Sequence, residues 1–266
     1  MEPRHCLEHR YRVRFDEAGA DGWLRPSGFL RYAQDMAWRH SEEAGFDRDW
    51  YAQRGMNWVV RNVQVAIERP ITYGDVLDIS TEVIGWRHVW ARRHCGIRRA
   101  GDGTATGTAQ GTATDVPVSM ATVATDWVLL SDDGRPARVP REIAAYFSTA
   151  APFTRDRVVL PEPDGDVTSL STRVRPLDVD PLRHMNNAAY LDLVEDAMAR
   201  MPEDQRLDGP DCYRIGYVRP ALPGAAIDVR CWRVRDGGVA CRLSDGQGQE
   251  LTKVLVSSSG AHPIAG

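Results

Sequence analysis

The densest group of chemically active side chains in this sequence lies in residues 178–187, which read DVDPLRHMNN. The segment ends where a helical pattern begins, and a helix N-terminus offers free backbone N–H groups and a positive dipole end. Such groups can hold a carbonyl oxygen as it becomes an oxyanion, while a nearby carboxylate activates water or attacks the carbonyl carbon. A thioester needs little more, because a thiolate leaves readily. The candidate groups are two carboxylates, an imidazole and two amides, from Asp178, Asp180, His184, Asn186 and Asn187.

Each of these residues also has a structural interpretation. Asp180 precedes Pro181, and an Asp-Pro pair commonly starts a turn. His184 could bond to the backbone inside that turn, and the two asparagines could cap the helix, a task compatible with catalysis. Asp178 is expected to stabilise the turn. The helix start directly after the turn favours Asp180 as the functional carboxylate.

Two stretches of the chain have the spacing of an amphipathic helix. The second begins after the turn, with Asn186 or Asn187 as its N-cap, and the first is expected to begin with Ser27 as N-cap after Pro26. The apolar positions of the second stretch are Tyr190, Leu193, Val194, Ala197, Met198 and Met201. Those of the first stretch are Phe29, Leu30, Ala33, Met36, Ala37 and Ala44.

The sequence around these helices repeats, which indicates two equivalent halves. Residues 12–19 read RVRFDEAG and residues 173–180 read RVRPLDVD, each before a helix. After each helix, residues 69–79 (RPITYGDVLDI) and 219–229 (RPALPGAAIDV) share an Arg-Pro pair, a glycine and an aspartate in the same order.

The two halves differ at the carboxylate. Depending on one gap, Asp180 aligns with Gly19 or Ala20, and His184 aligns at residues 23–24. The first half therefore lacks an equivalent carboxylate, and we expect one active site per chain, equipped by the second half.

Alternating apolar and polar residues after each helix predict runs of strands. Since these strands follow one another without helices between them, the sheets should be antiparallel. We expect an α+β protein of two tandem hot-dog domains, each a curved antiparallel sheet wrapped round one long helix. The predicted strands are 63–67, 76–84, 88–98, 121–130, 213–217, 227–234, 239–243 and 251–257.

Composition shifts divide the chain. Residues 1–140 form the N-terminal domain, the Pro- and Gly-containing residues 141–168 are expected to be a linker, and residues 169–266 form the catalytic C-terminal domain. The low-complexity residues 101–119 are expected to be a mobile hairpin tip.

The overall composition argues against several functional classes of protein. A net charge of −4 and a pI of about 6.0 argue against nucleic-acid binding, and no apolar stretch is long enough to span a membrane. The N-terminus has no secretory signal pattern. Five cysteines without a CxxC pair favour reduced thiols, a cytoplasmic location and no zinc site. No cofactor or metal is expected.

The stretch RVRPLDVDPLRHMNNAAYLDLVEDA resembles the second-domain motif of acyl–acyl carrier protein thioesterases, and DxDPxxHxNNxxY resembles the wider hydroxybenzoyl-CoA thioesterase type. In the first half, GFLRYAQDMAWRHSEEAGF and GMNWVVRNVQVAIERPITYGDVLDI resemble the N-terminal domain of the narrower family in order and spacing. The resemblance covers roughly residues 10–145 and 170–257. It implies hydrolysis of fatty acyl-carrier protein in fatty acid biosynthesis.

The resemblance also implies roles for single residues. Asp180 matches the catalytic carboxylate, as general base or nucleophile, and His184 and Asn187 match the histidine and second asparagine of the HxNN motif. The backbone N–H near Asn187 would be the oxyanion donor, and Asn186 would contact substrate. Plant-type enzymes differ in carrying an asparagine where this chain has Leu182, and an acidic residue and a cysteine on a later strand where this chain has Pro220 and Ala221.

Further residues are expected around the substrate. Met36 and Trp58 of the first half would form the wall for the acyl chain. Arg92 and Arg93 belong to a basic run that could contact the acidic carrier protein or the pantetheine phosphate, although such a run is also typical of a solvated strand face. Homodimerisation is possible. The alternatives are an acyl-CoA thioesterase of the same fold and a non-catalytic acyl-binding protein.

Overall fold

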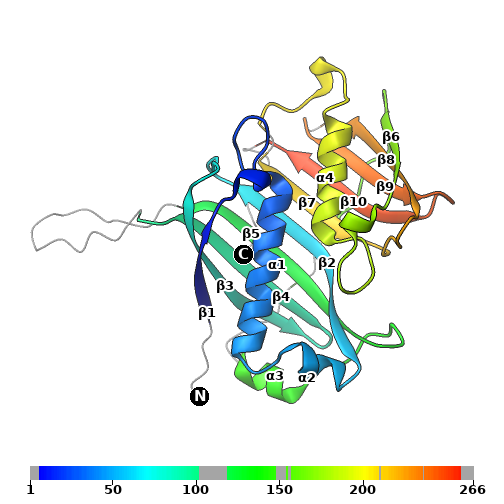
Figure 1. Ribbon diagram of the computed structural model, residues 1–266. Helices are drawn as coiled ribbons and strands as arrows, with labels where there is room; N and C mark the ends of the chain where they lie inside the picture. Colours follow the sequence, from blue (N-terminus) through cyan, green and yellow to red (C-terminus); the bar gives the residue numbers. More distant parts are fainter. Residues whose placement is uncertain are drawn as a thin grey trace, which may run out of the picture.

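One antiparallel sheet of ten strands runs through both halves of the described part of the chain (Figure 1). The computed structural model describes residues 6–101, 119–147, 154, 157–209, 211–235 and 237–258. The strand order is β1-β3-β4-β5-β2-β7-β10-β9-β8-β6. Each half of the chain supplies five consecutive strands of this order.

The first half contains the longer strands and the longest helix. Its elements are β1 (Cys6–Arg12), η1 (Phe15–Glu17), α1 (Pro26–Glu43), α2 (Arg48–Ala52), β2 (Met56–Ile67), β3 (Val76–Arg87), β4 (Trp90–Arg99), β5 (Ser119–Ser131) and α3 (Arg141–Tyr146).

The second half repeats this order with shorter strands. Its elements are β6 (Thr168–Arg173), η2 (Pro176–Asp178), α4 (Asn187–Met198), η3 (Glu203–Gln205), β7 (Cys212–Tyr217), β8 (Ala226–Arg233), β9 (Val239–Asp245) and β10 (Glu250–Ser257).

The two halves are related by the strand order itself. From the central pair outwards, β2, β5, β4, β3 and β1 correspond to β7, β10, β9, β8 and β6. The two five-stranded units are joined because β2 and β7 pair directly, with Val63 opposite Ile215 and Val65 opposite Tyr213. The two predicted hot-dog units therefore share one continuous sheet.

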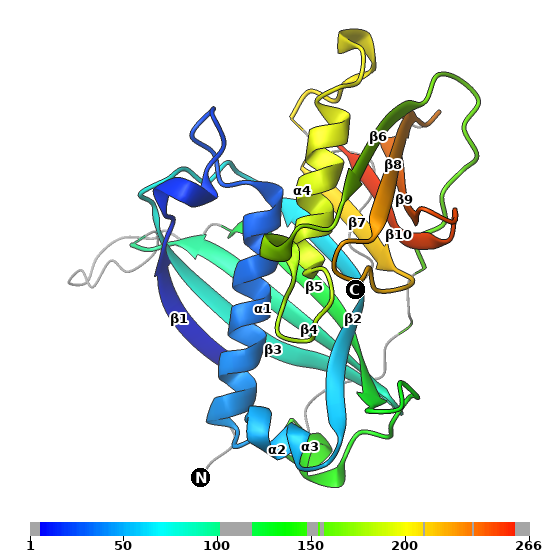
Figure 2. The same cartoon turned by 45° about the vertical axis from the view of Figure 1, so that its right-hand side comes forward.

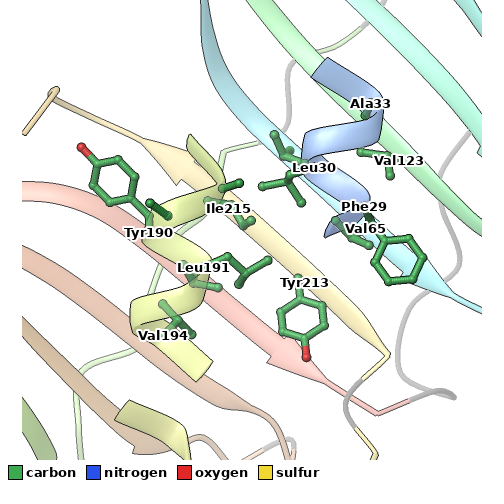
Figure 3. Close-up of a cluster of buried hydrophobic side chains, with 14 of the residues drawn as sticks. Phe29, Leu30, Ala33, Val65, Val123, Tyr190, Leu191, Val194, Tyr213 and Ile215 are labelled. Carbon is green, nitrogen blue, oxygen red and sulfur yellow. The ribbon is translucent and has the colours of Figure 1, made fainter. Parts of the chain in front are cut away.

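The helices α1 and α4 lie side by side against this sheet (Figures 1 and 2). Their apolar faces enter one core cluster, to which α1 contributes Leu30 and Ala33, α4 contributes Leu191, and β7 contributes Ile215 (Figure 3). Apolar burial of this kind dominates the stability of both helices. An ion pair between Arg31 and Asp192 (2.7 Å) also connects α1 with α4.

Several local expectations are corrected by the structure. Ser27 does not cap α1: the helix starts at Pro26 after Arg25, and the buried Ser27 hydroxyl instead accepts a hydrogen bond from Arg31 Nη1 (2.7 Å). Proline fits this first helical position because it has no N–H to leave unpaired. In the second half Asn186, one of the two predicted candidates, is the N-cap.

The interval 141–168 is more than a linker. It includes α3, whose buried Ile143 packs in a cluster of the first half, and Val158 and Leu160, which pack against Trp232 of the second half. Residues 102–118 of the low-complexity stretch lie outside the described residues.

The expectation of five reduced cysteines is wrong for two of them. Cys231 on β8 and Cys241 on β9 face each other in the strand register and form a disulfide, and both are fully buried. Cys6, Cys95 and Cys212 are free thiols.

Candidate active site

The turn between β6 and α4 is held by Asp178. This buried carboxylate accepts hydrogen bonds from the Arg175 backbone N–H (3.0 Å) and from Arg175 Nε and Nη2 (2.9 and 2.7 Å). The Arg175 side chain keeps the pKa of Asp178 below its usual range. Asp178 therefore has the turn-stabilising role that its sequence position predicts.

Asp180 lies at the tip of this turn and is half-buried. Its backbone N–H donates to the His184 carbonyl (2.8 Å), and its Oδ1 accepts from the Leu182 N–H (2.9 Å). Arg183 has a left-handed backbone (φ 62°), which lets the chain reverse within four residues. Only one carboxylate oxygen is used in these bonds, so the other is available to a ligand.

The start of α4 presents one available backbone amide. Asn186 Oδ1 accepts from the Ala188 N–H, and the Ala189 N–H donates to the Asn186 carbonyl. Within the described part of the chain, no hydrogen bond from the Asn187 N–H is found. The buried Tyr217 hydroxyl stabilises the start of α4, because it donates to the Asn187 carbonyl (2.8 Å).

A cavity of about 300 Å³ between the two halves brings these groups together. The second half contributes the turn, the start of α4 and the end of β7, and the first half contributes α1, β2 and β5. The lining residues include Gln34, Trp38, Glu42, Arg48, Trp58, Val60, Arg61, Trp127, Asp180, Leu182, His184, Met185, Asn187, Tyr190, Tyr217, Arg219 and Pro220.

Two family models match this chain. The Acyl-ACP thioesterase N-terminal domain matches residues 5–114, and the Acyl-ACP thioesterase C-terminal domain matches residues 162–258. The chain belongs to the acyl-ACP thioesterase family. The matched ranges contain both helices, both turns and all the cavity-lining strands except β5.

Similar proteins carry corresponding names. The acyl-[acyl-carrier-protein] hydrolase FATB2 of Cuphea viscosissima is 27% identical over 222 residues, 76% of this chain and 49% of the relative. The palmitoyl-acyl carrier protein thioesterase of Arabidopsis thaliana is 25% identical over 275 residues, 89% of this chain and 62% of the relative. The chain thus spans about half to three fifths of the length of these relatives, both of which are called chloroplastic.

Solved structures of the family have the same fold. The 12:0-ACP thioesterase from Umbellularia californica superposes with a TM-score of 0.77 at 17% identity, covering 96% of this chain and 97% of that one. An acyl-ACP thioesterase from Bacteroides thetaiotaomicron gives a TM-score of 0.75 at 12% identity, covering 95% and 97%. At these identities the likeness establishes the tandem hot-dog fold alone.

The structure brings together four of the eight site residues that the sequence predicts. Asp180, His184, Asn187 and Trp58 all line the cavity between the halves. Asn186 is absent from the described lining, because its side chain caps α4.

Three other predicted residues lie elsewhere. Met36 is fully buried in the core and is not among the described residues that line the cavity. Arg92 forms a two-bond ion pair with the buried Asp126 (2.7 and 2.9 Å). Arg93 faces the interior, bonded to His40 Nδ1 (2.8 Å), where burial lowers its pKa to about 10. This geometry does not support carrier binding by Arg92 and Arg93.

Arg93 instead lines a smaller cavity inside the first half. Aromatic rings form its walls, and Trp38, Trp58 and Trp127 line both this cavity and the one that contains Asp180. The two cavities are therefore adjacent, with the tryptophans between them. The period-2 alternation of Arg93, Cys95 and Ile97 along β4 could have indicated this inward direction, because the latter two residues are apolar and buried.

The sequence analysis did not identify the arginines of the cavity. Arg61 donates from Nη1 to the Val218 carbonyl (3.0 Å), and burial lowers its pKa. Arg219 pairs with Gln249, and Arg48 is exposed. No carboxylate partner of these three arginines is found in the described residues. The sequence repeat aligns Arg219 with Arg69, but it gave no indication that Arg219 lies at this cavity.

The turn of the first half differs from the turn that carries Asp180. Gly19 donates its N–H to the Trp23 carbonyl (2.8 Å), as Asp180 does to His184, so the alignment has no gap and Gly19 is the equivalent of Asp180. Pro26 is the equivalent of Asn187, and it has no N–H. The first-half turn therefore lacks both the carboxylate and the amide.

The described residues contain neither a membrane-spanning helix nor a metal-binding cluster. None of their helices has the length and apolar character needed to span a membrane. No cluster of three or more His, Cys, Asp or Glu side chains among them could hold a metal ion.

Proposed function

We propose that this chain hydrolyses fatty acyl thioesters of acyl carrier protein and releases the free fatty acid. The observation that carries the proposal is the placement of Asp180 and of the available Asn187 N–H at one cavity between the halves. Membership of the acyl-ACP thioesterase family and the names of the plant relatives support the substrate class.

The chemistry follows from these two groups. Asp180 takes a proton from water, the water oxygen bonds to the thioester carbonyl carbon, and the carbonyl electron pair moves to oxygen. The Asn187 N–H at the positive end of α4 stabilises that oxyanion. When the oxyanion collapses, the C–S bond breaks and the thiolate leaves as free carrier thiol after protonation. His184 orients the water or the substrate.

A covalent route uses the same groups. Asp180 Oδ attacks the carbonyl carbon, the thiolate leaves, and water then hydrolyses the mixed anhydride. Single turnover in ¹⁸O-labelled water separates the routes, since label enters the Asp180 carboxylate only when an anhydride forms.

The first half supplies the acyl-chain wall in this proposal. Trp58 and Trp38 line the cavity next to the turn and also the adjoining aromatic cavity. We infer that the acyl chain leaves the thioester along these rings. The arginines at the same cavity, Arg61 and Arg219, would meet the phosphate of the pantetheine arm in place of Arg92 and Arg93.

The test compares Asp180→Asn with the wild type on acyl-carrier protein and acyl-CoA of equal chain length. We expect kcat to fall by about 10²–10⁴-fold, the usual contribution of a positioned base. Asp196→Asn is the matched control, because Asp196 is exposed on α4 and pairs with Arg200. Unchanged turnover in Asp180→Asn would refute the role of Asp180.

Other outcomes identify the alternatives. A higher kcat/KM for acyl-CoA than for acyl-carrier protein would make the chain an acyl-CoA thioesterase. Acyl binding without turnover would make it a non-catalytic binding protein. A cytoplasmic location and a homodimer remain predictions, which cell fractionation and sedimentation would check.

A further inference from the structure

The aromatic cavity of the first half has one charged side chain, that of Arg93, among the described residues that line it. Its volume is about 50 Å³, which leaves room for a few ligand atoms, since one water needs about 10–15 Å³. No acidic side chain belongs to this described lining. Arg93 is surrounded by protein and keeps part of its surface open to the cavity. Such a cation is unusual, because enclosed charges are normally paired.

Two groups contact the Arg93 guanidinium in the described part of the chain. Nη1 donates to His40 Nδ1 (2.8 Å), and the centre of the Phe147 ring lies 5.8 Å from Cζ. Because arginine can only donate, His40 Nδ1 is the acceptor and carries no proton, so the imidazole is neutral. A ring face attracts a cation but carries no net charge. Neither contact therefore neutralises the charge of Arg93.

The ionisable groups nearest to Arg93 are neutral as well. Burial raises the pKa of the Cys95 thiol to about 12 and raises the pKa of Tyr51, so both keep their protons at neutral pH. The Tyr51 hydroxyl accepts from Trp58 Nε1 (3.0 Å) and shares a hydrogen bond with Ser41 Oγ (3.2 Å). Arg93 itself stays charged, since burial lowers its pKa only to about 10. An enclosed cation without a counter-ion points to an anionic ligand.

The remaining edge of Arg93 has the geometry that binds a carboxylate. Nη1 is occupied by His40, and within the described residues neither Nε nor Nη2 donates a hydrogen bond. Three other arginines of this protein bind a carboxylate through that same pair of nitrogens. These pairs are Arg10–Asp78, Arg92–Asp126 and Arg175–Asp178. Water in the cavity would accept from Nε and Nη2 without neutralising the charge, so a carboxylate is the better ligand.

The position of the cavity identifies which molecule brings the carboxylate. Trp38, Trp58 and Trp127 line both this cavity and the one that contains Asp180. An acyl chain whose thioester carbonyl lies at Asp180 and whose tail follows these rings reaches Arg93 with its far end. The anionic group is therefore part of the acyl chain, at the end remote from the thioester.

We propose that Arg93 selects acyl chains that carry a terminal carboxylate, so that the preferred substrates are monothioesters of long-chain diacids. The carboxylate oxygens accept from Nε and Nη2, and the methylene groups pack against the three tryptophans. This proposal rests on the proposed function, because the thioester must lie at Asp180 for the tail to reach Arg93. Arg93 acts on substrate choice and takes no part in breaking the C–S bond.

The test compares carrier-protein thioesters of straight-chain diacids and monoacids that have equal numbers of carbons. At the chain length that brings the terminal carboxylate to Arg93, the wild type should have at least a tenfold higher kcat/KM for the diacid thioester, mainly through a lower KM. Arg93→Met removes the charge and keeps an unbranched side chain, so it should abolish this preference. Arg93→Lys should retain part of it, since the charge remains but the two-nitrogen edge is lost.

A matched control and a binding measurement complete the experiment. Arg98→Met is the control, because Arg98 lies on the same strand and pairs with Glu8 at the surface. It should keep the full preference for the diacid thioester. Tryptophan fluorescence titrated with the free diacid and monoacid measures binding without turnover, and the tighter binding of the diacid should be lost in Arg93→Met. If Arg93→Met does not fold, the comparison of the two substrates in the wild type still decides.

An equal or higher kcat/KM for the monoacid thioester at every chain length in the wild type would overturn the proposal. An unchanged preference for the diacid thioester in Arg93→Met would do the same. Both results leave the thioesterase function intact. If instead no thioester is hydrolysed but the free diacid binds through Arg93, the proposed function fails and the carboxylate site stands.

Discussion

Asp180 and Gly19 occupy the same position in two copies of one turn, and each donates its backbone N–H to a carbonyl oxygen four residues later at 2.8 Å. The following helices differ at their first residue, which is Asn187 in α4 and Pro26 in α1. One half therefore retained the carboxylate together with an available amide, and the other half has neither.

This relationship predicts that a carboxylate alone cannot restore the first-half site. Gly19→Asp in the Asp180→Asn background should remain at the activity of Asp180→Asn, because Pro26 offers no N–H to an oxyanion. The new Cβ would also come within 2.9 Å of Asp21 Oδ1, which must shift. Steady-state hydrolysis of an acyl thioester is the measurement. Recovery of more than a few per cent of wild-type kcat would show that the Asn187 amide is dispensable.

The buried hydroxyls of Tyr190 and Tyr217, near the Asp180 turn, should differ in their contribution to stability. Tyr190 accepts a hydrogen bond from the Ala221 N–H (2.8 Å), so Tyr190→Phe leaves a buried backbone donor unpaired, at a cost of about 1–3 kcal/mol. Tyr217→Phe is the control, since it removes a donor to the Asn187 carbonyl and leaves no N–H unpaired. Urea unfolding should therefore show the larger loss for Tyr190→Phe. Equal losses would contradict this account.

The cysteines give a prediction that needs no variant. In the folded protein Cys6 should react first with a thiol reagent, because it is exposed, while Cys95 is buried and its pKa is raised to about 12. In denaturant without reductant, mass spectrometry should count three labels per chain, and five after reduction. Five labels without reductant would show that the Cys231–Cys241 bond is absent from the protein.

Local patterns in the sequence were sufficient to predict the turn that carries Asp180. Asp180, His184 and Asn187 lie within eight residues, so a turn and the start of a helix bring them together without any long-range contact. The helices were predictable for the same reason, since their apolar spacing reflects one buried face. The missing first-half carboxylate was also visible from the repeat.

Features that depend on pairing between distant segments were harder to predict from the sequence. The opposite wall of the cavity, including Trp38 and Arg61, comes from the other half, and single-sequence patterns do not give the β2–β7 junction that places it. The disulfide could have been predicted from a local pattern in the sequence. Cys231 and Cys241 flank the sequence Asp-Gly-Gly at residues 236–238, which is typical of a hairpin turn, so strand register would have placed them opposite each other.

The stability of the protein should depend on pH through Glu195. Burial, with smaller contributions from Asp192 and Asp21, raises its pKa from 4.5 to about 7, while the nearby Tyr213 hydroxyl acts in the opposite direction. The folded state then holds a proton that the unfolded state releases above about pH 4.5. The contribution of Glu195 is fully present below that pH and is lost as the pH rises through about 7.

Glu195→Gln removes this dependence, because the amide does not titrate. Relative to the variant, the wild type should lose roughly 3 kcal/mol of unfolding free energy between pH 4.5 and pH 8, from 1.36 kcal/mol per pKa unit. Arg31, which pairs with Asp192, is unchanged in both proteins, so the difference isolates the carboxyl group. Urea unfolding at several pH values provides the two curves. Parallel curves would mean that Glu195 has the same pKa in the folded and the unfolded protein, which would contradict this account.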